Sequence, residues 1–557
     1  MLLEYNDVSD KTQDGLRAGI ATLRQLLREY GRRLPCLEIR DHADFPRRGV
    51  MLDISRGRVP TLETVLGLVE HLADFKINEI QLYTEHTFAY SGYERVWRSW
   101  GAFTGREIRK LAVRCGELGI DLVPNQNSFG HLRHWLEYPP LQELAEVRGP
   151  WRLPWGQVVR WPFSLAPRHP KTLKFLRGLY DELLPNFRSP FFNVGCDETW
   201  DLGLGQSAKI CQRLGKGRVY LEFLRQIHRE VIRRGRTMMF WGDIILQYPE
   251  LIRRLPKKKL VAMNWGYEAE HPFEKEAPLF ARAGIPFYVC AGTSTWQTLI
   301  GRHDNAQRNL QKAARIGLKH GAIGFLNTDW GDGGHPQPLA VSYIPYAIGA
   351  GVSWCGKSFR LECVVPMLNR DVFADGTGRT GKAAYGLGLA HQRLHHTAFN
   401  CTPIGAALAA PPPSHGEIWC KDGLKYYSRI KRRYLEQTLQ EIERQRATLH
   451  KGRPATPGAR LLAKELDLAA RMAAESCRYM LWQQSSAASR YADANAMARR
   501  SIRALQSIEK DFRHCWPKRN KATPDKCCTF LRWRIEDYQT RRLYYEPADA
   551  AKDSLVQ

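Results

Sequence analysis

Short apolar runs alternate with helical patterns through the middle of the chain, from about residue 48 onward. Eight runs have the length of strands, at residues 50–54, 80–83, 122–124, 191–195, 237–241, 260–264, 286–290 and 322–326. Between them, apolar residues recur at helical spacing, for example over residues 62–75, 105–118, 171–184 and 219–234. Eight strands that each lead into a helix or a long crossover predict a (β/α)8 TIM barrel. A doubly wound sheet also alternates, but it usually has fewer strands and a phosphate-binding first turn, which this sequence lacks.

The two ends of the chain follow other patterns. Residues 12–30 have the apolar spacing of one amphipathic helix. The strand pattern stops after about residue 385, three prolines follow at 411–413, and residues 421–449, 459–483 and 487–513 have the spacing of long helices. The sequence therefore predicts an N-terminal helix and strand segment (1–45), a catalytic barrel (46–385) and a C-terminal α-helical domain (386–557).

Composition places the chain among folded globular proteins. Of its 557 residues, 43% are apolar and 25% are charged, which excludes a disordered or fibrous chain. Lys and Arg exceed Asp and Glu by 83 to 57, a net charge of +26. Much of this excess lies in runs such as 429–433 and 257–259, which are typical of solvated surfaces, so we expect no specific nucleic-acid partner.

Targeting signals and cysteine usage indicate the cellular compartment of the protein. No apolar run approaches the length of a membrane span, so we expect no membrane partner. The first residues carry acids where a signal peptide needs basic and then apolar residues. The 13 cysteines are odd in number and form no Cys-x-x-Cys pair, which favours reduced thiols and a cytoplasmic location.

Polar and aromatic residues follow the predicted strands, where a barrel of this kind has its active site. In chain order they are Glu85, His131, Asp197 with Glu198, Trp241 with Asp243, Trp265, Trp296, and Trp330 with Asp332. An aromatic-walled pocket with acids suits a sugar ring, because indoles cover its C–H faces and carboxylates accept its hydroxyls.

The adjacent acids Asp197 and Glu198 suggest a mechanism. Glycosidases normally place two carboxyl groups about 5–9.5 Å apart across the sugar. Neighbours at a strand end are expected to point in different directions, and the seventh strand supplies no acid. One mechanism needs a single protein acid, because the substrate's own 2-acetamido oxygen attacks the anomeric carbon. Asp197 would then hold the acetamide nitrogen and stabilise the oxazolinium charge, while Glu198 protonates the leaving oxygen.

Five motifs carry a resemblance to a known family, among them Glu85-His-Thr-Phe88 and Gly130-His131, which fall where that family has its loop acid and its Gly-His. The run Arg48-Gly-Val-Met-Leu-Asp-Ile-Ser-Arg56 resembles the first barrel strand of glycoside hydrolase family 20, the β-N-acetylhexosaminidases. Asn193-Val-Gly-Cys-Asp-Glu198 is similar to that family's His-x-Gly-Gly-Asp-Glu signature, and Trp330-x-Asp332 to its Trp-x-Glu. The resemblance spans about residues 15–355 in consistent order.

This resemblance implies an exo-acting, retaining β-N-acetylhexosaminidase that needs no metal or organic cofactor. Its substrate would be an oligosaccharide or glycoconjugate ending in N-acetylglucosamine or N-acetylgalactosamine. It also implies a remnant of the family's N-terminal α+β domain within residues 1–45. By this resemblance Arg48 would bind the sugar's O3 and O4, and Asp332 would bind O4 or O6. Trp241, Trp296 and Trp330, with Trp265, would form the walls around the sugar and its acetamide group. Glu85 would relay charge through His131 to Glu198.

The sequence departs from the family pattern at three points. Cys196 replaces a glycine, Asp332 is one methylene shorter than the family's Glu, and no Tyr-Leu-Asp follows the seventh strand, where the family's Tyr holds the acetamide oxygen. Two alternatives therefore stand beside the leading hypothesis. One is a barrel glycosidase of other sugar specificity, and the other is a catalytically silent carbohydrate-binding protein.

Overall fold

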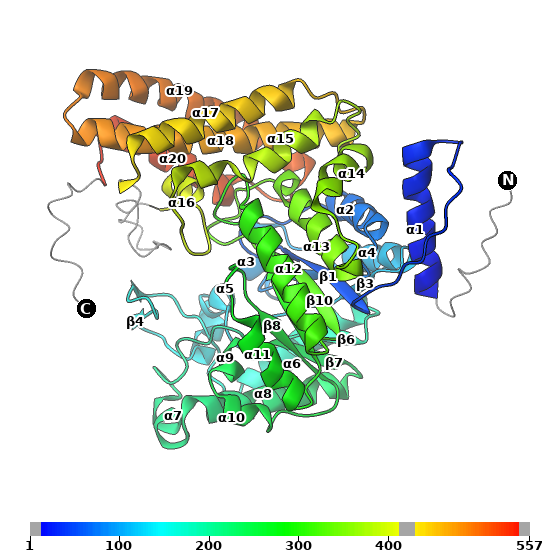
Figure 1. The fold of residues 1–557 in the computed structure, drawn as a ribbon. Coiled ribbons are helices and arrows are strands. Elements are labelled where there is room, and N and C mark those ends of the chain that lie inside the picture. Colours follow the sequence, from blue (N-terminus) through cyan, green and yellow to red (C-terminus); the bar gives the residue numbers. More distant parts are fainter. Residues whose placement is uncertain (1–12, 412–428, 545–557) are drawn as a thin grey trace.

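A computed structural model of the protein describes residues 13–411 and 429–544. Eight parallel strands form one sheet in the order β3-β2-β1-β10-β9-β8-β7-β6. They are β1 (Arg47–Asp53), β2 (Glu79–Tyr83), β3 (Asp121–Val123), β6 (Phe191–Asn193), β7 (Thr237–Trp241), β8 (Leu260–Trp265), β9 (Phe287–Gly292) and β10 (Gly324–Asp329). A parallel bridge between Asn125 and Asn193 joins the two edges. The predicted (β/α)8 barrel is confirmed, and each predicted strand overlaps an observed one (Figure 1).

Alternation along the strands divides the core into two layers. Met51 of β1, Met239 of β7 and Met263 of β8 belong to a cluster inside the barrel. Val50 and Leu52, their neighbours along β1, belong to a larger cluster between the strands and the helices. Side chains alternate between the two faces of a strand. Every second residue along a strand therefore faces the barrel interior, and the residues between them face the helices.

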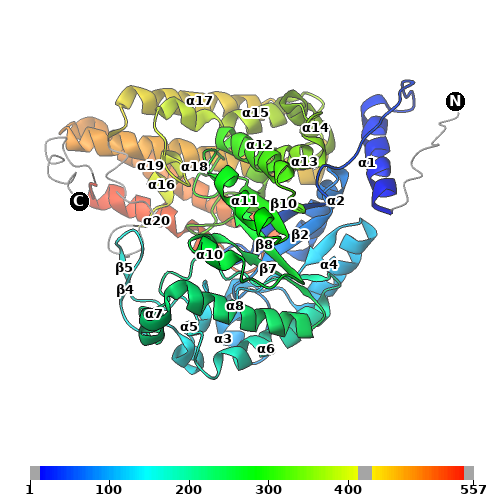
Figure 2. The same cartoon turned by 60° about the horizontal axis from the view of Figure 1, so that its bottom comes forward.

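Helices cover the outside of the barrel and continue beyond it (Figures 1 and 2). Around the barrel and its loops lie α2 (Leu62–Asp74), α3 (Glu94–Trp97), α4 (Gly105–Glu117), α5 (Arg133–Leu136), α6 (Thr172–Leu183), α7 (Ala208–Leu214), α8 (Lys216–Arg233), α9 (Asp243–Leu246), α10 (Pro249–Ile252), α11 (Phe273–Arg282), α12 (His303–Lys319) and α13 (Tyr343–Cys355). Local sequence sets their starts: the Thr104 and Glu107 side chains form a capping box at α4.

The C-terminal part is helical, as predicted. It comprises α14 (Val364–Asp371), α15 (Arg379–Leu387), α16 (Pro403–Ala409), α17 (Arg432–His450), α18 (Pro457–Ala487), α19 (Tyr491–Cys515) and α20 (Asp525–Thr540). Residues 421–428 of the predicted first long helix lie outside the described residues. A bridge between Pro60 and Asn520 joins this part to the loop after β1. The bundle therefore packs beside the strand ends that carry the acids.

A short hairpin and the last described helix, α20, are among the elements that were not predicted from the sequence. The hairpin of β4 (Trp151–Arg152) and β5 (Val158–Val159) is too short for a strand pattern. Helix α20 has little amphipathic contrast, because it buries polar residues as well as apolar ones. The fully buried Arg534 of α20 pairs with the fully buried Asp537 at 3.1 Å and donates to the carbonyl of Ala407.

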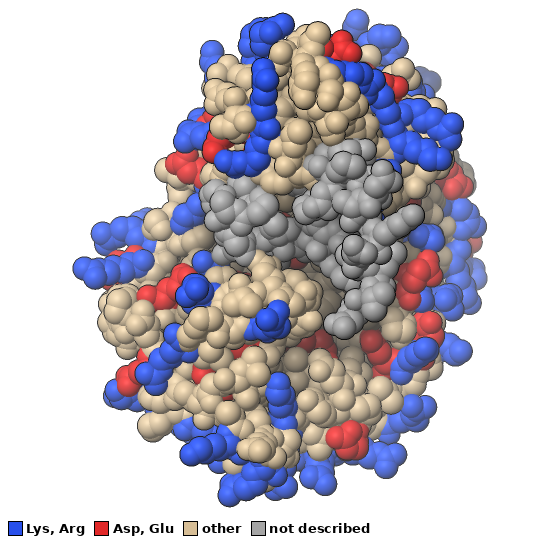
Figure 3. Space-filling model, turned by 90° about the vertical axis from the view of Figure 1, so that its left-hand side faces the viewer, with Lys and Arg blue, Asp and Glu red and all other residues tan. Residues whose placement is uncertain are grey.

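The surface carries the basic excess in a dispersed form. On the face shown in Figure 3, Lys and Arg side chains lie around the whole outline, with Asp and Glu between them. Many described arginines pair with acids, such as Arg446 with Glu443 at 2.8 Å. Within residues 13–411 and 429–544, no helix has the length and apolar character needed to cross a membrane.

Candidate active site

Asp197 and Glu198 lie in a tight turn just after β6. Gly195, Cys196 and Glu198 all have left-handed backbones, with φ of +66°, +71° and +49°. A Cβ on Gly195 would collide with the Asn127 side chain, so only glycine fits there. Cys196 adopts a conformation that L side chains rarely take, which explains why glycine suits this position. The turn therefore stores backbone strain next to the two acids.

Both carboxylates turn toward one ring nitrogen of His131. Its Nε2 lies 3.3 Å from Asp197 Oδ2 and 3.1 Å from Glu198 Oε2. The expectation that the two acids point in different directions is wrong, because the left-handed turn brings both carboxylates to the same ring nitrogen of His131. They lie side by side and do not face each other across a gap.

His131 links the acids to a second charged cluster. Its Nδ1 lies 3.6 Å from Glu85 Oε1, which also accepts a hydrogen bond from the Tyr83 hydroxyl at 2.9 Å. Burial would lower the pKa of His131, but the carboxylates of Asp197 and Glu198 raise it well above its ordinary value. The two acids therefore favour the protonated, cationic form of the His131 imidazole. The expected connection from Glu85 through His131 to Glu198 is present as a set of contacts.

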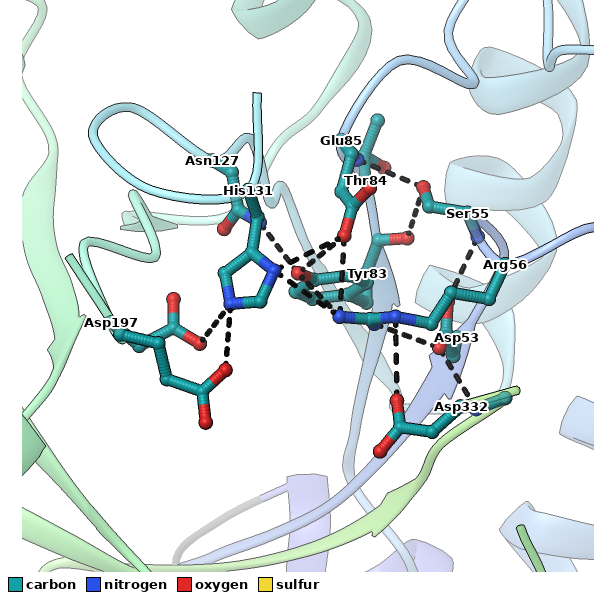
Figure 4. Close-up of polar contacts among 12 residues, drawn as sticks. Asp53, Ser55, Arg56, Tyr83, Thr84, Glu85, Asn127, His131, Asp197 and Asp332 are labelled. Atoms are coloured by element: carbon teal, nitrogen blue, oxygen red, sulfur yellow. Dashed lines mark hydrogen bonds and ion pairs between the residues drawn. The ribbon is translucent and has the colours of Figure 1, made fainter. Parts of the chain in front are cut away.

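Arg56 is the centre of this second cluster. Its guanidinium pairs with Asp53 at 2.9 Å, with Glu85 at 3.3 Å and with Asp332 at 3.3 Å (Figure 4). It also lies over the Trp330 ring, 5.1 Å from the centroid. Burial would lower the pKa of Arg56, but the surrounding acids raise it well above its ordinary value. Three acids on one guanidinium form a rigid polar wall of the site.

Arg48 lies elsewhere, which corrects a prediction from the sequence. It stands at the start of β1 and alternates with Met51 and Asp53, so it faces the outer layer at the far end of the barrel. Its Nε donates to the carbonyl of Lys76 at 2.9 Å, and one terminal nitrogen donates to the carbonyl of Phe45 at 2.7 Å. The expected contact of Arg48 with a sugar is therefore wrong, and Arg56 at the other end of the same motif occupies the site.

Asp332 lies where the sequence placed it, at the strand ends. Its side chain is about one-third exposed. Burial and the nearby charges of Asp53 and Glu198 raise its pKa to about 6, although Arg56 opposes this. This pKa is still below 7, so the ionised form of Asp332 prevails at neutral pH. Its exposed carboxylate can accept a hydrogen bond from a hydroxyl group.

The tryptophans gather inside the barrel. Trp241, Trp296 and Trp330 belong to the interior cluster, with Trp265 packed against it. Trp241 and Trp330 are neighbours, with ring centroids 6.0 Å apart. The four predicted tryptophans therefore line the same interior space.

Tyr267 belongs to this aromatic wall and was missed in the sequence. Its ring stacks on Trp265 at 5.1 Å and meets Trp296 edge-on at 5.3 Å. The signal for it was present, because Met263, Trp265 and Tyr267 follow one another at every second position. Extending the strand alternation two residues past β8 would have placed Tyr267 inside the barrel.

Asp243, which directly follows Trp241-Gly242, holds the strained turn. Its Oδ2 accepts the backbone N–H of Glu198 at 2.9 Å. Burial, together with the charges of Asp197 and Glu198, raises the pKa of Asp243 well above the ordinary carboxyl range. Its surroundings therefore favour the protonated form of Asp243, which supports the turn through the Glu198 N–H.

Three comparisons with known proteins agree with this geometry. Residues 45–313 match the description of glycosyl hydrolase family 20, catalytic domain. A β-hexosaminidase of Vibrio furnissii is 28% identical over 258 residues, which cover 40% of this chain and 41% of the relative. Hexosaminidase D of Homo sapiens is 23% identical over 260 residues, covering 43% and 50%. A lacto-N-biosidase of Bifidobacterium bifidum is 23% identical over 252 residues, covering 43% and 21%.

Solved structures share the fold over more of the chain. A chitobiase of Flavobacterium johnsoniae has a TM-score of 0.54 at 16% identity, covering 93% of this chain and 82% of that one. An exo β-N-acetylglucosaminidase of Vibrio harveyi has a TM-score of 0.51 at 17% identity, covering 67% and 64%. The chain spans at most half the length of the three curated relatives above. Residues 45–313, which include seven of the eight barrel strands, belong to glycosyl hydrolase family 20.

Proposed function

We propose that this chain is an exo-acting, retaining β-N-acetylhexosaminidase in which the substrate's acetamide is the nucleophile. One observation carries the proposal. Asp197 and Glu198 lie side by side on His131, and Asp197 Oδ1 is buried without a hydrogen-bond partner among the described residues. A buried carboxylate oxygen needs a donor, and the N–H of an acetamide group supplies one.

The proposed reaction begins with attack of the acetamide oxygen on the anomeric carbon. As this bond forms, the glycosidic C–O bond breaks, and Glu198 gives its proton to the leaving oxygen. Asp197 accepts the acetamide N–H and balances the positive charge of the oxazolinium ring. Water then attacks the anomeric carbon and gives a proton to Glu198, which restores the acid. Two inversions at the anomeric carbon leave its configuration retained.

The surrounding groups supply orientation. His131 Nε2 lies 3.1 Å from Glu198 Oε2 and orients that carboxyl group toward the leaving oxygen. The interior tryptophans would cover the faces of the sugar and its acetamide methyl group. Tyr267, inside the same aromatic wall, is the donor we propose for the acetamide oxygen in place of the missing family Tyr.

We expect Arg56→Ala to lower kcat/KM by about 10-fold or more, because a charge-assisted hydrogen bond contributes roughly 1.5–3 kcal/mol. Arg56 and Asp332 would together hold the sugar hydroxyls, the role that the sequence assigned to Arg48. The matched control is Arg48→Ala, which should lower the melting temperature and leave kcat/KM near that of the wild type. Steady-state kinetics and thermal melts of both variants make the comparison. The reverse pattern would restore Arg48 as the binding residue.

A panel of substrates tests the proposed function directly. Nitrophenyl N-acetylglucosaminide and N-acetylgalactosaminide should be hydrolysed, and a thiazoline that mimics the oxazolinium ring should inhibit both reactions. The corresponding glucoside, which lacks the acetamide, should not be hydrolysed. Turnover of the glucoside without thiazoline inhibition would favour a glycosidase of other specificity. Sugar binding without any turnover would favour a catalytically silent carbohydrate-binding protein.

Asp243→Asn should flatten the dependence of stability on pH. An acid with a raised pKa in the folded state contributes stability at low pH. That stability is lost as pH rises from the ordinary carboxyl pKa of about 3.9 to the raised value. The Asn variant can still accept the Glu198 N–H but has no proton to lose. Its melting temperature should therefore fall less than that of the wild type between pH 5 and pH 8. Equal slopes for the two proteins would contradict the raised pKa of Asp243.

A further inference from the structure

The N-terminal helix α1 (Gln13–Tyr30) turns its apolar side toward solvent. Leu16, Ile20, Leu27 and Tyr30 are each 45–50% exposed, and Leu23 between them is partly exposed. Large apolar side chains scattered singly on a surface are ordinary, but here five of them share one helix face. This face, defined by these five residues, is called the α1 stripe below.

The opposite side of α1 is fixed to the barrel by polar contacts. Gln25 donates to the carbonyl of Asp74 at 2.7 Å, and Arg28 pairs with the carboxylate of Asp74 at 2.7 Å. Ala21 is the one residue of the described helix that is buried. Because these contacts tie α2 to the polar side of α1, the helix cannot turn its stripe inward without breaking them.

The spacing of the α1 stripe matches a coiled-coil seam. Its residues follow one another at intervals of four, three, four and three, which is the spacing of the a and d positions in a heptad pattern. Such a seam packs best against another seam of the same spacing, with each side chain inserted between residues of the partner helix. A second copy of this chain presents that seam. No charged residue interrupts it.

The location and size of the surface allow such a pairing. Helix α1 lies at the outer edge of the molecule (Figures 1 and 2), where one side contacts α2 and, through the pair of Arg28 with Asp371 at 3.5 Å, α14. Leu37 and Ile39, shortly after α1, are 47% and 49% exposed and add apolar surface near the same end of the chain. Six such half-exposed side chains offer roughly 500 Å² per copy, so two copies approach the ~1,000 Å² that a specific interface requires.

We propose that two copies of this chain associate through their α1 stripes to form a two-fold symmetric dimer. A two-fold axis brings the same surface of each copy together, so a self-complementary seam on one helix is sufficient. The interface lies on a different part of the molecule from the acids at the strand ends. It therefore does not depend on the proposed function, and it can be measured without any substrate.

Sedimentation velocity of the full chain over a range of protein concentrations tests this proposal. The wild type should change from monomer to dimer as concentration rises, with a Kd near the micromolar range expected of a small interface. The double variant Ile20→Glu/Leu27→Glu should raise that Kd by at least about 100-fold, because four charges would be buried in the seam. Its circular dichroism spectrum should match that of the wild type, since both side chains face solvent in the monomer.

The matched control is Leu318→Glu on α12, where an apolar side chain is 40% exposed away from α1. This variant should dimerise as the wild type does. A wild type that stays monomeric at about 100 µM would overturn the proposal. A dimer that survives the double variant, or that is lost equally in Leu318→Glu, would also overturn it, because another surface would then hold the two copies together.

Discussion

Replacing Glu198 by Gln should lower kcat by about 10²–10⁴-fold for substrates with alkyl or sugar leaving groups. A poor leaving group needs a proton as its bond to the anomeric carbon breaks, and the amide of Gln has none to give. Nitrophenolate leaves without help, so a nitrophenyl substrate should lose much less. Kinetics of the variant on a chitooligosaccharide and on a nitrophenyl sugar give the two values.

The size of this difference identifies the acid. The Glu198 side chain is 28% exposed, so the variant should fold, and a thermal melt checks that it does. Gln keeps an oxygen that can lie at the same 3.1 Å from His131 Nε2, which leaves the neighbouring contacts in place. Equal losses on both substrates would assign Glu198 a role other than general acid, such as positioning of His131.

The barrel was predictable because strand spacing is a local property of the sequence. Each of the eight apolar runs is buried on both sides by helices and by the barrel interior, which produces an unbroken apolar pattern. The β4–β5 hairpin lacks such a pattern, since each of its strands has only two residues. Helix α20 was missed for a related reason, because its buried Arg534 and Asp537 read as surface residues in a sequence.

The site was predictable in its members more than in its geometry. The rule that strand ends carry the active site correctly gathered the acids and tryptophans at one end. The error at Arg48 arose because the motif was taken as a whole, without asking which end of the strand each residue occupies. Arg48 is the second residue of β1 and Arg56 lies beyond its end, so the two guanidinium groups lie near opposite ends of the strand.

Backbone conformation is the second feature that spacing does not reveal. The direction of the Asp197 and Glu198 side chains depends on left-handed φ values at Cys196 and Glu198, which are not glycines. Those values are held by long-range contacts, such as the hydrogen bond from the Tyr220 hydroxyl to the carbonyl of Cys196 at 2.9 Å. A residue 24 positions away in the sequence thus supports the turn that brings both carboxylates to His131.

The Asp197→Asn variant tests the acetamide mechanism itself, and we expect it to lower kcat by about 10²–10³-fold. Asn keeps the shape of the side chain but carries no charge to balance the oxazolinium ring. The loss should appear on nitrophenyl substrates as well as on poor leaving groups, because the charge develops in both. This pattern differs from that of Glu198→Gln, so the two variants separate the two proposed roles.

Tight binding of the oxazolinium mimic should depend on the same charge. A thiazoline should bind the wild type far more tightly than the parent sugar, since it resembles the cyclised intermediate. In Asp197→Asn most of that advantage should disappear, while affinity for the parent sugar should change little. A fluorosugar that leaves a covalent ester on Asp197, detected by mass spectrometry, would contradict this mechanism. It would make Asp197 the nucleophile, because an acetamide that attacks the anomeric carbon leaves no bond between sugar and protein.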